Sequence, residues 1–168
     1  MTDPLSKYAR FAASFLSVAL FAAASYAADV REMKSASTIA SVFPAKARLR
    51  LLNVWATWCV PCVEEMPDLA AIDRMFGAEL AIAGVSMDDS VPDTSKSKVV
   101  SFLDQKRITF PNVYYTGLPD ALGEHLRFRG GIPVTILYDR NGKELWRHEG
   151  RLDKQKTIAV IRQHLRRK

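Results

Sequence analysis

Few of the residues that build metal centres are present in this chain. Its 168 residues include only two cysteines and three histidines, and the histidines are scattered, at His125, His148 and His164. One closely spaced pair of cysteines supplies half of a four-ligand zinc site, and no second pair completes it. The sequence therefore predicts no metal site and no bound cofactor.

A basic surface for nucleic acid is also lacking. The formal net charge is +6, but much of the basic excess lies at the end of the chain, at Arg162, Arg166, Arg167 and Lys168. Cations are favourable at the C-terminal end of a helix, and no aromatic residues are interleaved with them. We expect a solvated helix end and no nucleic-acid partner; a patch for acidic partners or lipid headgroups is the alternative.

The longest apolar stretch is too short for a typical membrane-spanning helix. It covers residues 11–24, about 14 residues against the ~20 that cross a bilayer. Lys7 and Arg10 precede it and small residues follow it around Ala27, which is the order of a secretory signal. We expect residues 1–27 to be a signal peptide, with an uncleaved anchor as the alternative. Residues 28–48 then form an N-terminal segment and residues 49–168 one domain, exported to the periplasm.

Strand and helix patterns alternate through this domain. Residues 49–55 form a mostly apolar run typical of a buried strand. Apolar residues then recur three or four apart from Met66 to Phe76, which predicts a helix that ends at Gly77. Further strands are predicted at 80–86, 110–115, 134–138 and 143–148, and further helices at 94–106, 118–128 and from 153 onward. The pattern predicts an α/β fold, a mixed central sheet flanked by helices. Residues 29–48 show only a short helix, around 37–43.

The two cysteines, Cys59 and Cys62, fall at the turn between the first predicted strand and its helix. They are too close in sequence for a disulfide between them to stabilise the fold much. A helix N-terminus favours a thiolate, and lowering a cysteine pKa from ~8.5 to ~7 is worth roughly 2 kcal/mol. We therefore predict that Cys59 is the attacking nucleophile and that Cys62, one turn later, resolves the mixed disulfide.

Two segments resemble a known family. The fifteen residues from Asn53 to Pro67 resemble the active-site signature of TlpA/ResA-like thiol–disulfide oxidoreductases of the thioredoxin superfamily, and residues 131–135 resemble the second signature. The resemblance implies a thioredoxin-like fold in which residues 80–115 contain an inserted strand–helix unit. It also implies that Pro133 is a cis-proline facing the disulfide; a trans proline opening a strand is the alternative. Trp58 and the backbone of Ile132 are then expected to bind an extended substrate segment.

The direction of the reaction depends on charged residues near the sulfurs. Glu65 matches an active-site glutamate of the ResA-like proteins, and as a carboxylate it would oppose thiolate formation and take the proton of Cys62. An ordinary first-turn helix acid is the alternative, and this is what we expect of Glu64. Arg127 and Arg129 would act in the opposite sense if they faced the sulfurs, and we expect both to face solvent.

A cysteine pair is a stronger reductant when its surroundings destabilise the thiolate. The hypothesis is therefore an exported reductant of protein disulfides, for example in cytochrome c maturation or the upkeep of copper-site cysteines, recharged by a membrane electron donor. The membrane itself is a partner only if the signal is uncleaved. Two alternatives remain open: a disulfide oxidase that uses the same pair, and a periplasmic copper chaperone that adds a histidine or methionine to both thiols. Met66, the nearest methionine, is expected in the core.

Overall fold

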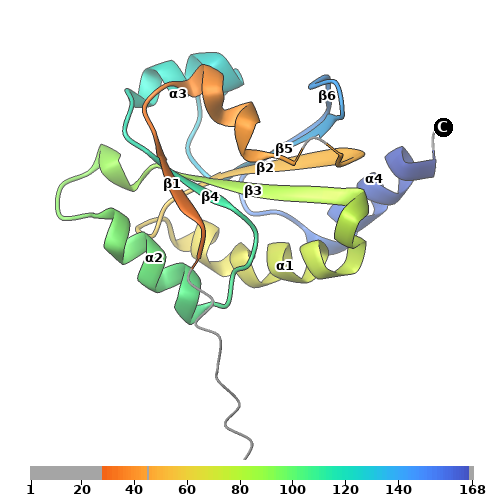
Figure 1. Ribbon diagram of the computed structural model, residues 1–168, viewed down its shortest axis with the longest axis horizontal. Helices are drawn as coiled ribbons and strands as arrows, with labels where there is room; N and C mark the ends of the chain where they lie inside the picture. Colours follow the sequence, from red (N-terminus) through yellow and green to blue (C-terminus); the bar gives the residue numbers. More distant parts are fainter. Residues whose placement is uncertain (1–27, 45, 167–168) are drawn as a thin grey trace, which may run out of the picture.

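A six-stranded mixed sheet forms the centre of the protein (Figure 1). The structure is a computed structural model that describes residues 28–44 and 46–166. The expected signal peptide, residues 1–27, lies outside these residues. The sheet order is β1-β4-β3-β2-β5-β6. β1, β4, β3 and β2 are mutually parallel, β5 runs antiparallel to β2, and β6 runs antiparallel to β5. The strands are β1 (Val30–Met33), β2 (Leu49–Trp55), β3 (Leu80–Ser86), β4 (Asn112–Tyr115), β5 (Val134–Asp139) and β6 (Glu144–Glu149).

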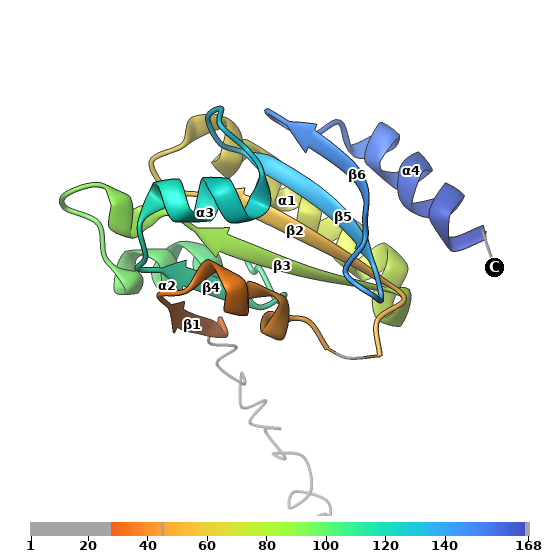
Figure 2. The ribbon, with the colours of Figure 1, turned by 90° about the horizontal axis from the view of Figure 1, so that it is seen from above.

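Helices cover both faces of the sheet (Figure 2). One face packs against α1 (Val60–Phe76), α2 (Lys96–Gln105) and α4 (Lys154–Arg166), and the other against α3 (Pro119–Leu126) and the 3-10 helix η2 (Ala36–Val42). Two short 3-10 helices, η3 (Gly77–Glu79) and η4 (Asp88–Ser90), flank β3. In the part of the chain that the structure describes, no helix is both long and apolar enough to cross a membrane.

β2 supplies both cores because its side chains alternate between the two faces. Leu51 and Trp55 lie in the core beneath α1, whereas Leu52 and Val54 lie in the core beneath α3. The strand is hydrogen-bonded on both sides, to β3 and β5. This explains its nearly continuous apolar sequence, and it gives the turn that follows Trp55 a rigid starting point.

A hydrogen bond between β2 and β4 passes over a glycine of β3 and fixes the carboxyl end of β2. Trp55 Nε1 donates a hydrogen bond of 3.0 Å to Asn112 Oδ1, across the intervening strand β3. A Cβ on Gly84 of β3 would overlap Asn112 Oδ1 and would lie 2.8 Å from Trp55 Nε1. Only glycine therefore leaves room for this bond.

The predicted order of elements from residue 49 onward is confirmed, and each predicted strand and helix is present. The sequence interpretation was wrong about the segment before it, which contains β1 as well as the expected short helix. β1 pairs only with β4, at the edge of the sheet, and its middle residues, Arg31 and Glu32, are exposed. A four-residue polar edge strand carries no apolar periodicity that a sequence pattern could reveal.

Candidate active site

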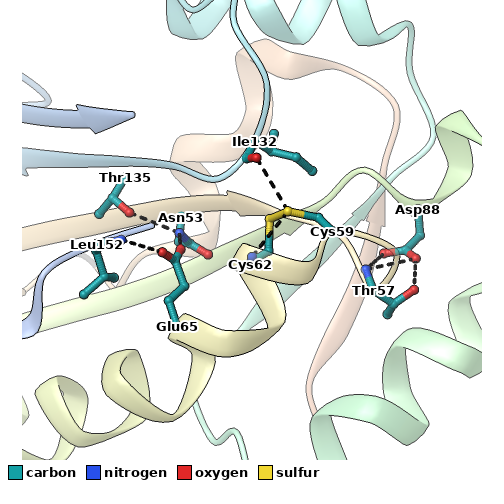
Figure 3. The surroundings of a disulfide bond; sticks show 9 residues. All are labelled: Asn53, Thr57, Cys59, Cys62, Glu65, Asp88, Ile132, Thr135 and Leu152. Atoms are coloured by element: carbon teal, nitrogen blue, oxygen red, sulfur yellow. Dashed lines mark hydrogen bonds between the residues drawn. A yellow bond between two sulfur atoms is a disulfide. The ribbon is translucent and has the colours of Figure 1, made fainter. Parts of the chain in front are cut away.

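The two cysteines form a disulfide at the junction of β2 and α1, with an S–S distance of 2.01 Å (Figure 3). Cys59 is the N-cap of α1, and its sulfur accepts a hydrogen bond from the backbone N–H of Cys62 at 3.3 Å. Pro61 follows within the first turn, where its missing N–H costs nothing. The sulfur of Cys59 thus faces the positive end of the helix dipole, as the sequence predicted.

The two sulfurs differ in accessibility. Cys59 retains 6% of its surface, whereas Cys62 is completely buried. The residues on either side of Cys59, Trp58 and Val60, are exposed apolar side chains, with 46% and 68% of their surface accessible. Only Cys59 can therefore meet another protein directly, and it does so within an apolar rim suited to binding.

The second signature lies against the disulfide. β5 runs antiparallel to β2, so its first residues enter the sheet at the edge where β2 ends. The Ile132–Pro133 peptide bond is cis, and Pro133 is buried. The carbonyl oxygen of Ile132 lies 3.5 Å from Cys59 Sγ. A disulfide sulfur carries no proton, so this contact can become a hydrogen bond only when Cys59 is reduced.

Glu65 lies one helical turn after Cys62 and is completely buried. Its Oε1 accepts from Asn53 Nδ2 at 2.8 Å, and its Oε2 accepts from the backbone N–H of Leu152 at 2.8 Å. Burial raises the pKa of Glu65 above its ordinary value of 4.5, against the lowering effects of the hydrogen bonds from Leu152 and Asn53. The side chain is therefore placed to bind a proton more readily than a surface glutamate.

Asn53 joins Glu65 to the sheet. Its Nδ2 also donates to Thr135 Oγ1 on β5, at 3.1 Å, while its Oδ1 is buried and accepts no hydrogen bond from the residues that the structure describes. Proton uptake by Glu65 could be accommodated by rotation of this amide, since Oδ1 would then accept from the carboxylic acid and from Thr135. The sequence analysis missed Thr135 and Leu152 as parts of this cluster, because each reaches it from a distant element.

The other charged residues named from the sequence lie on the surface. Glu64 is exposed and forms an ion pair with Arg151 at 2.8 Å. Arg127 is 72% exposed and pairs with Glu144 at 2.6 Å, and Arg129 is also exposed. The expectation that both arginines face solvent is confirmed, so neither stabilises a thiolate at Cys59.

A second buried acid near the disulfide was missed. Asp88 follows β3, and its carboxylate accepts hydrogen bonds from the backbone N–H and the hydroxyl of Thr57, in the turn between β2 and Cys59. The order of the strands in the sheet could have revealed Asp88. Neighbouring parallel strands bring the residues after their carboxyl ends together, and β2 and β3 are such neighbours.

Within the described ranges, 28–44 and 46–166, no group of three or more His, Cys, Asp or Glu side chains is arranged to hold a metal ion. The histidines lie on α3, β6 and α4. His148 Nε2 is 3.0 Å from the backbone oxygen of Arg151, and its ring stacks on Trp146. Met66 is completely buried in the core, as predicted.

Comparison with known proteins identifies the family to which the chain belongs. Residues 23–165 match the Redoxin family. The thioredoxin-like protein YneN of Bacillus subtilis is 31% identical over 116 residues, which are 68% of this chain and 64% of that protein. The thiol-disulfide oxidoreductase ResA of Geobacillus thermodenitrificans is 33% identical over 119 residues, 68% of this chain and 59% of that protein. The chain thus spans less than two thirds of the length of these relatives.

The fold has solved counterparts. A thiol-disulfide isomerase from Corynebacterium glutamicum superposes with a TM-score of 0.65 at 20% identity, covering 74% of this chain and 85% of that one. Together with the arrangement of the sheet, this confirms the thioredoxin-like fold. The matched relatives likewise confirm the resemblance to TlpA/ResA-like proteins.

Proposed function

This chain belongs to the Redoxin family, and from that premise we propose that it is an exported thiol–disulfide oxidoreductase that works as a reductant of protein disulfides. The observation that carries the direction is the position of Glu65. A fully buried carboxylate with a raised pKa lies one turn from Cys62, while Arg127 and Arg129 are exposed. A site that opposes thiolate charge favours the disulfide form of the protein, and such a protein is a reductant.

The reaction begins with the reduced protein. The Cys59 thiolate attacks one sulfur of a substrate disulfide, which breaks the substrate S–S bond, forms a Cys59–substrate disulfide and releases the other substrate sulfur as a thiolate. Glu65 then takes the proton of Cys62. The Cys62 thiolate attacks Cys59 Sγ, forms the Cys59–Cys62 disulfide and releases the second substrate thiolate. Two electrons pass from the protein to the substrate.

Two surfaces position the substrate. The exposed ring of Trp58 supplies apolar contact, and the half-buried Ile132 offers backbone groups beside Cys59. An extended segment around the substrate disulfide can pair with this backbone as an added strand does. Cysteines of cytochrome c precursors or of copper sites are substrates of this kind.

The proposed compartment is supported by the first residues of the sequence. The basic start, short apolar run and small residues of positions 1–27 support export, with a membrane anchor if the segment is retained. In an oxidising compartment a reductant must be recharged, and this requires an electron donor in the membrane.

The reduction potential tests the proposal. The purified protein is equilibrated with glutathione and dithiothreitol buffers, and free thiols are counted. A value near or below about −270 mV supports a reductant, and a value near about −120 mV means that the protein is an oxidase. The variant Glu65→Gln should raise the potential, whereas Glu64→Gln, which removes the same charge from an exposed neighbour, should leave it unchanged.

A further inference from the structure

The disulfide lies between two buried acids. Of the acidic residues that the structure describes, Glu65 and Asp88 are completely buried. They approach the Cys59–Cys62 pair from different elements, Glu65 from α1 and Asp88 from the segment after β3, and Figure 3 shows them on opposite sides of the disulfide. Buried acids are rare in proteins, so two beside one redox pair require an explanation.

Asp88 is held entirely by neutral donors. Its Oδ2 accepts from the backbone N–H of Thr57 at 3.1 Å and from Ser86 Oγ at 2.6 Å, and its Oδ1 accepts from the hydroxyl of Thr57. None of the ion pairs formed by residues 28–44 and 46–166 involves Asp88. No cation among the described residues is paired with its charge, which therefore acts on the groups that lie nearby.

The nearby group is the turn that leads into the nucleophile. Thr57 precedes Cys59 by two residues, and the same turn is fixed by two backbone bonds, from Met87 N to Trp55 O at 2.9 Å and from Cys59 N to Ala56 O at 3.2 Å. The Asp88 carboxylate thus cannot move away from the start of α1 without releasing the turn.

We propose that Asp88 is a positioning residue that also sets the redox equilibrium: it holds the Thr57 turn in place and, as a fixed negative charge, makes the Cys59–Cys62 pair more reducing. The inference deepens the proposed function and rests on it for the direction of electron flow. Reduction of the disulfide by two electrons places negative charge on Cys59, whereas the disulfide itself is neutral. A fixed negative charge beside the pair therefore disfavours the reduced protein and favours the disulfide.

This role differs from that of Glu65. Glu65 can gain or lose a proton during a reaction cycle, and its raised pKa suits it to do so. Asp88 is held by donors from Thr57 and Ser86, which fix the orientation of its carboxylate against the turn. Glu65 moves a proton, whereas Asp88 holds the turn and places its charge beside it.

The test is the equilibrium of the protein with glutathione, measured for Asp88→Asn and Thr57→Val. Asp88→Asn removes the charge and should shift the equilibrium toward the reduced protein about tenfold, which corresponds to a potential about 30 mV higher. Thr57→Val removes one donor but keeps the charge, so the potential should stay unchanged or fall. Leu122→Ala, which truncates a buried side chain of α3 in the core that does not contain the cysteines, serves as a control that lowers stability and should leave the potential unchanged.

Two results would overturn the inference. One is an unchanged or lower potential for Asp88→Asn. The other is an equal rise for Thr57→Val and Asp88→Asn, because disruption of the turn would then be sufficient. If Asp88→Asn does not fold, Ser86→Ala is measured instead: like Thr57→Val it removes one donor and keeps the charge, so a higher potential would overturn the inference. Each shift is measured relative to the unchanged protein, so an absolute potential in the range of a disulfide oxidase would reject the proposed function without affecting this inference.

Discussion

Replacing Glu65 by glutamine should abolish the pH dependence that this residue gives to stability. Burial raises the pKa of Glu65 above 4.5, so between pH 4.5 and the folded-state pKa the folded protein holds a proton that the unfolded chain has lost. The free energy of unfolding must then fall as pH rises, by up to about 1.4 kcal/mol per pH unit for one group. The stabilising contribution is fully present below pH 4.5 and is lost above the folded-state pKa.

The glutamine variant has a second, pH-independent effect. Its amide oxygen can accept from either Asn53 Nδ2 or Leu152 N–H, but its NH2 group then faces the other donor, at a cost of about 1–3 kcal/mol. This hydrogen-bonding cost does not change with pH. The pH dependence of the difference in unfolding free energy between wild type and variant therefore reports only the ionisation of Glu65. Glu64→Gln is the matched control, because Glu64 is an exposed neighbour paired with Arg151.

Urea unfolding of the oxidised proteins between pH 3.5 and 8 measures these differences. The free energy of unfolding of the wild type minus that of Glu65→Gln should decline with increasing pH and then level off. Glu64→Gln, measured in parallel, gives the effect of removing an exposed carboxylate. A difference that rises with pH would show that the folded state prefers the ionised Glu65, and it would remove the basis for its role as proton acceptor.

Three further substitutions test the site and its support. Cys62→Ser should accumulate a mixed disulfide at Cys59 with a peptide disulfide, visible by mass spectrometry; no adduct would mean that Cys59 is not the nucleophile. Gly84→Ala should lower the free energy of unfolding by about 2–4 kcal/mol through overpacking and loss of the Trp55–Asn112 bond, whereas Gly131→Ala, whose Cβ meets nothing, should change it by less than about 0.5 kcal/mol. Trp58→Ala should slow exchange with a peptide disulfide several-fold and leave exchange with glutathione nearly unchanged; equal slowing with both would argue against substrate binding by the ring.

The part of the fold that depends on apolar periodicity could be predicted from the sequence. The strand 49–55 and the helix after it have strong patterns because both are buried, and the cysteine spacing placed the redox pair at their junction. β1 could not be predicted, since its position at the sheet edge leaves its middle residues in water.

The surroundings of the redox pair were predictable only in part. Glu65 is close to Cys62 in sequence, and its identity was sufficient to suggest a role. Asp88 lies at the site because β3 pairs with β2, and Leu152 lies there because the loop before α4 passes Glu65. No local sequence pattern predicts either contact. Burial, which raises the pKa of Glu65, is likewise a property of the packed structure.

The antiparallel pairing of β2 and β5 separates the redox pair from the β5–β6 turn. β5 begins beside the disulfide and ends next to Leu49, at the amino end of β2. The turn that follows contains Asn141 and Gly142, both exposed, at a distance of about 20 Å along the strand. A fluorescent group or affinity tag inserted there would report on the protein, or capture its trapped substrate complexes, without approaching the face on which exchange takes place.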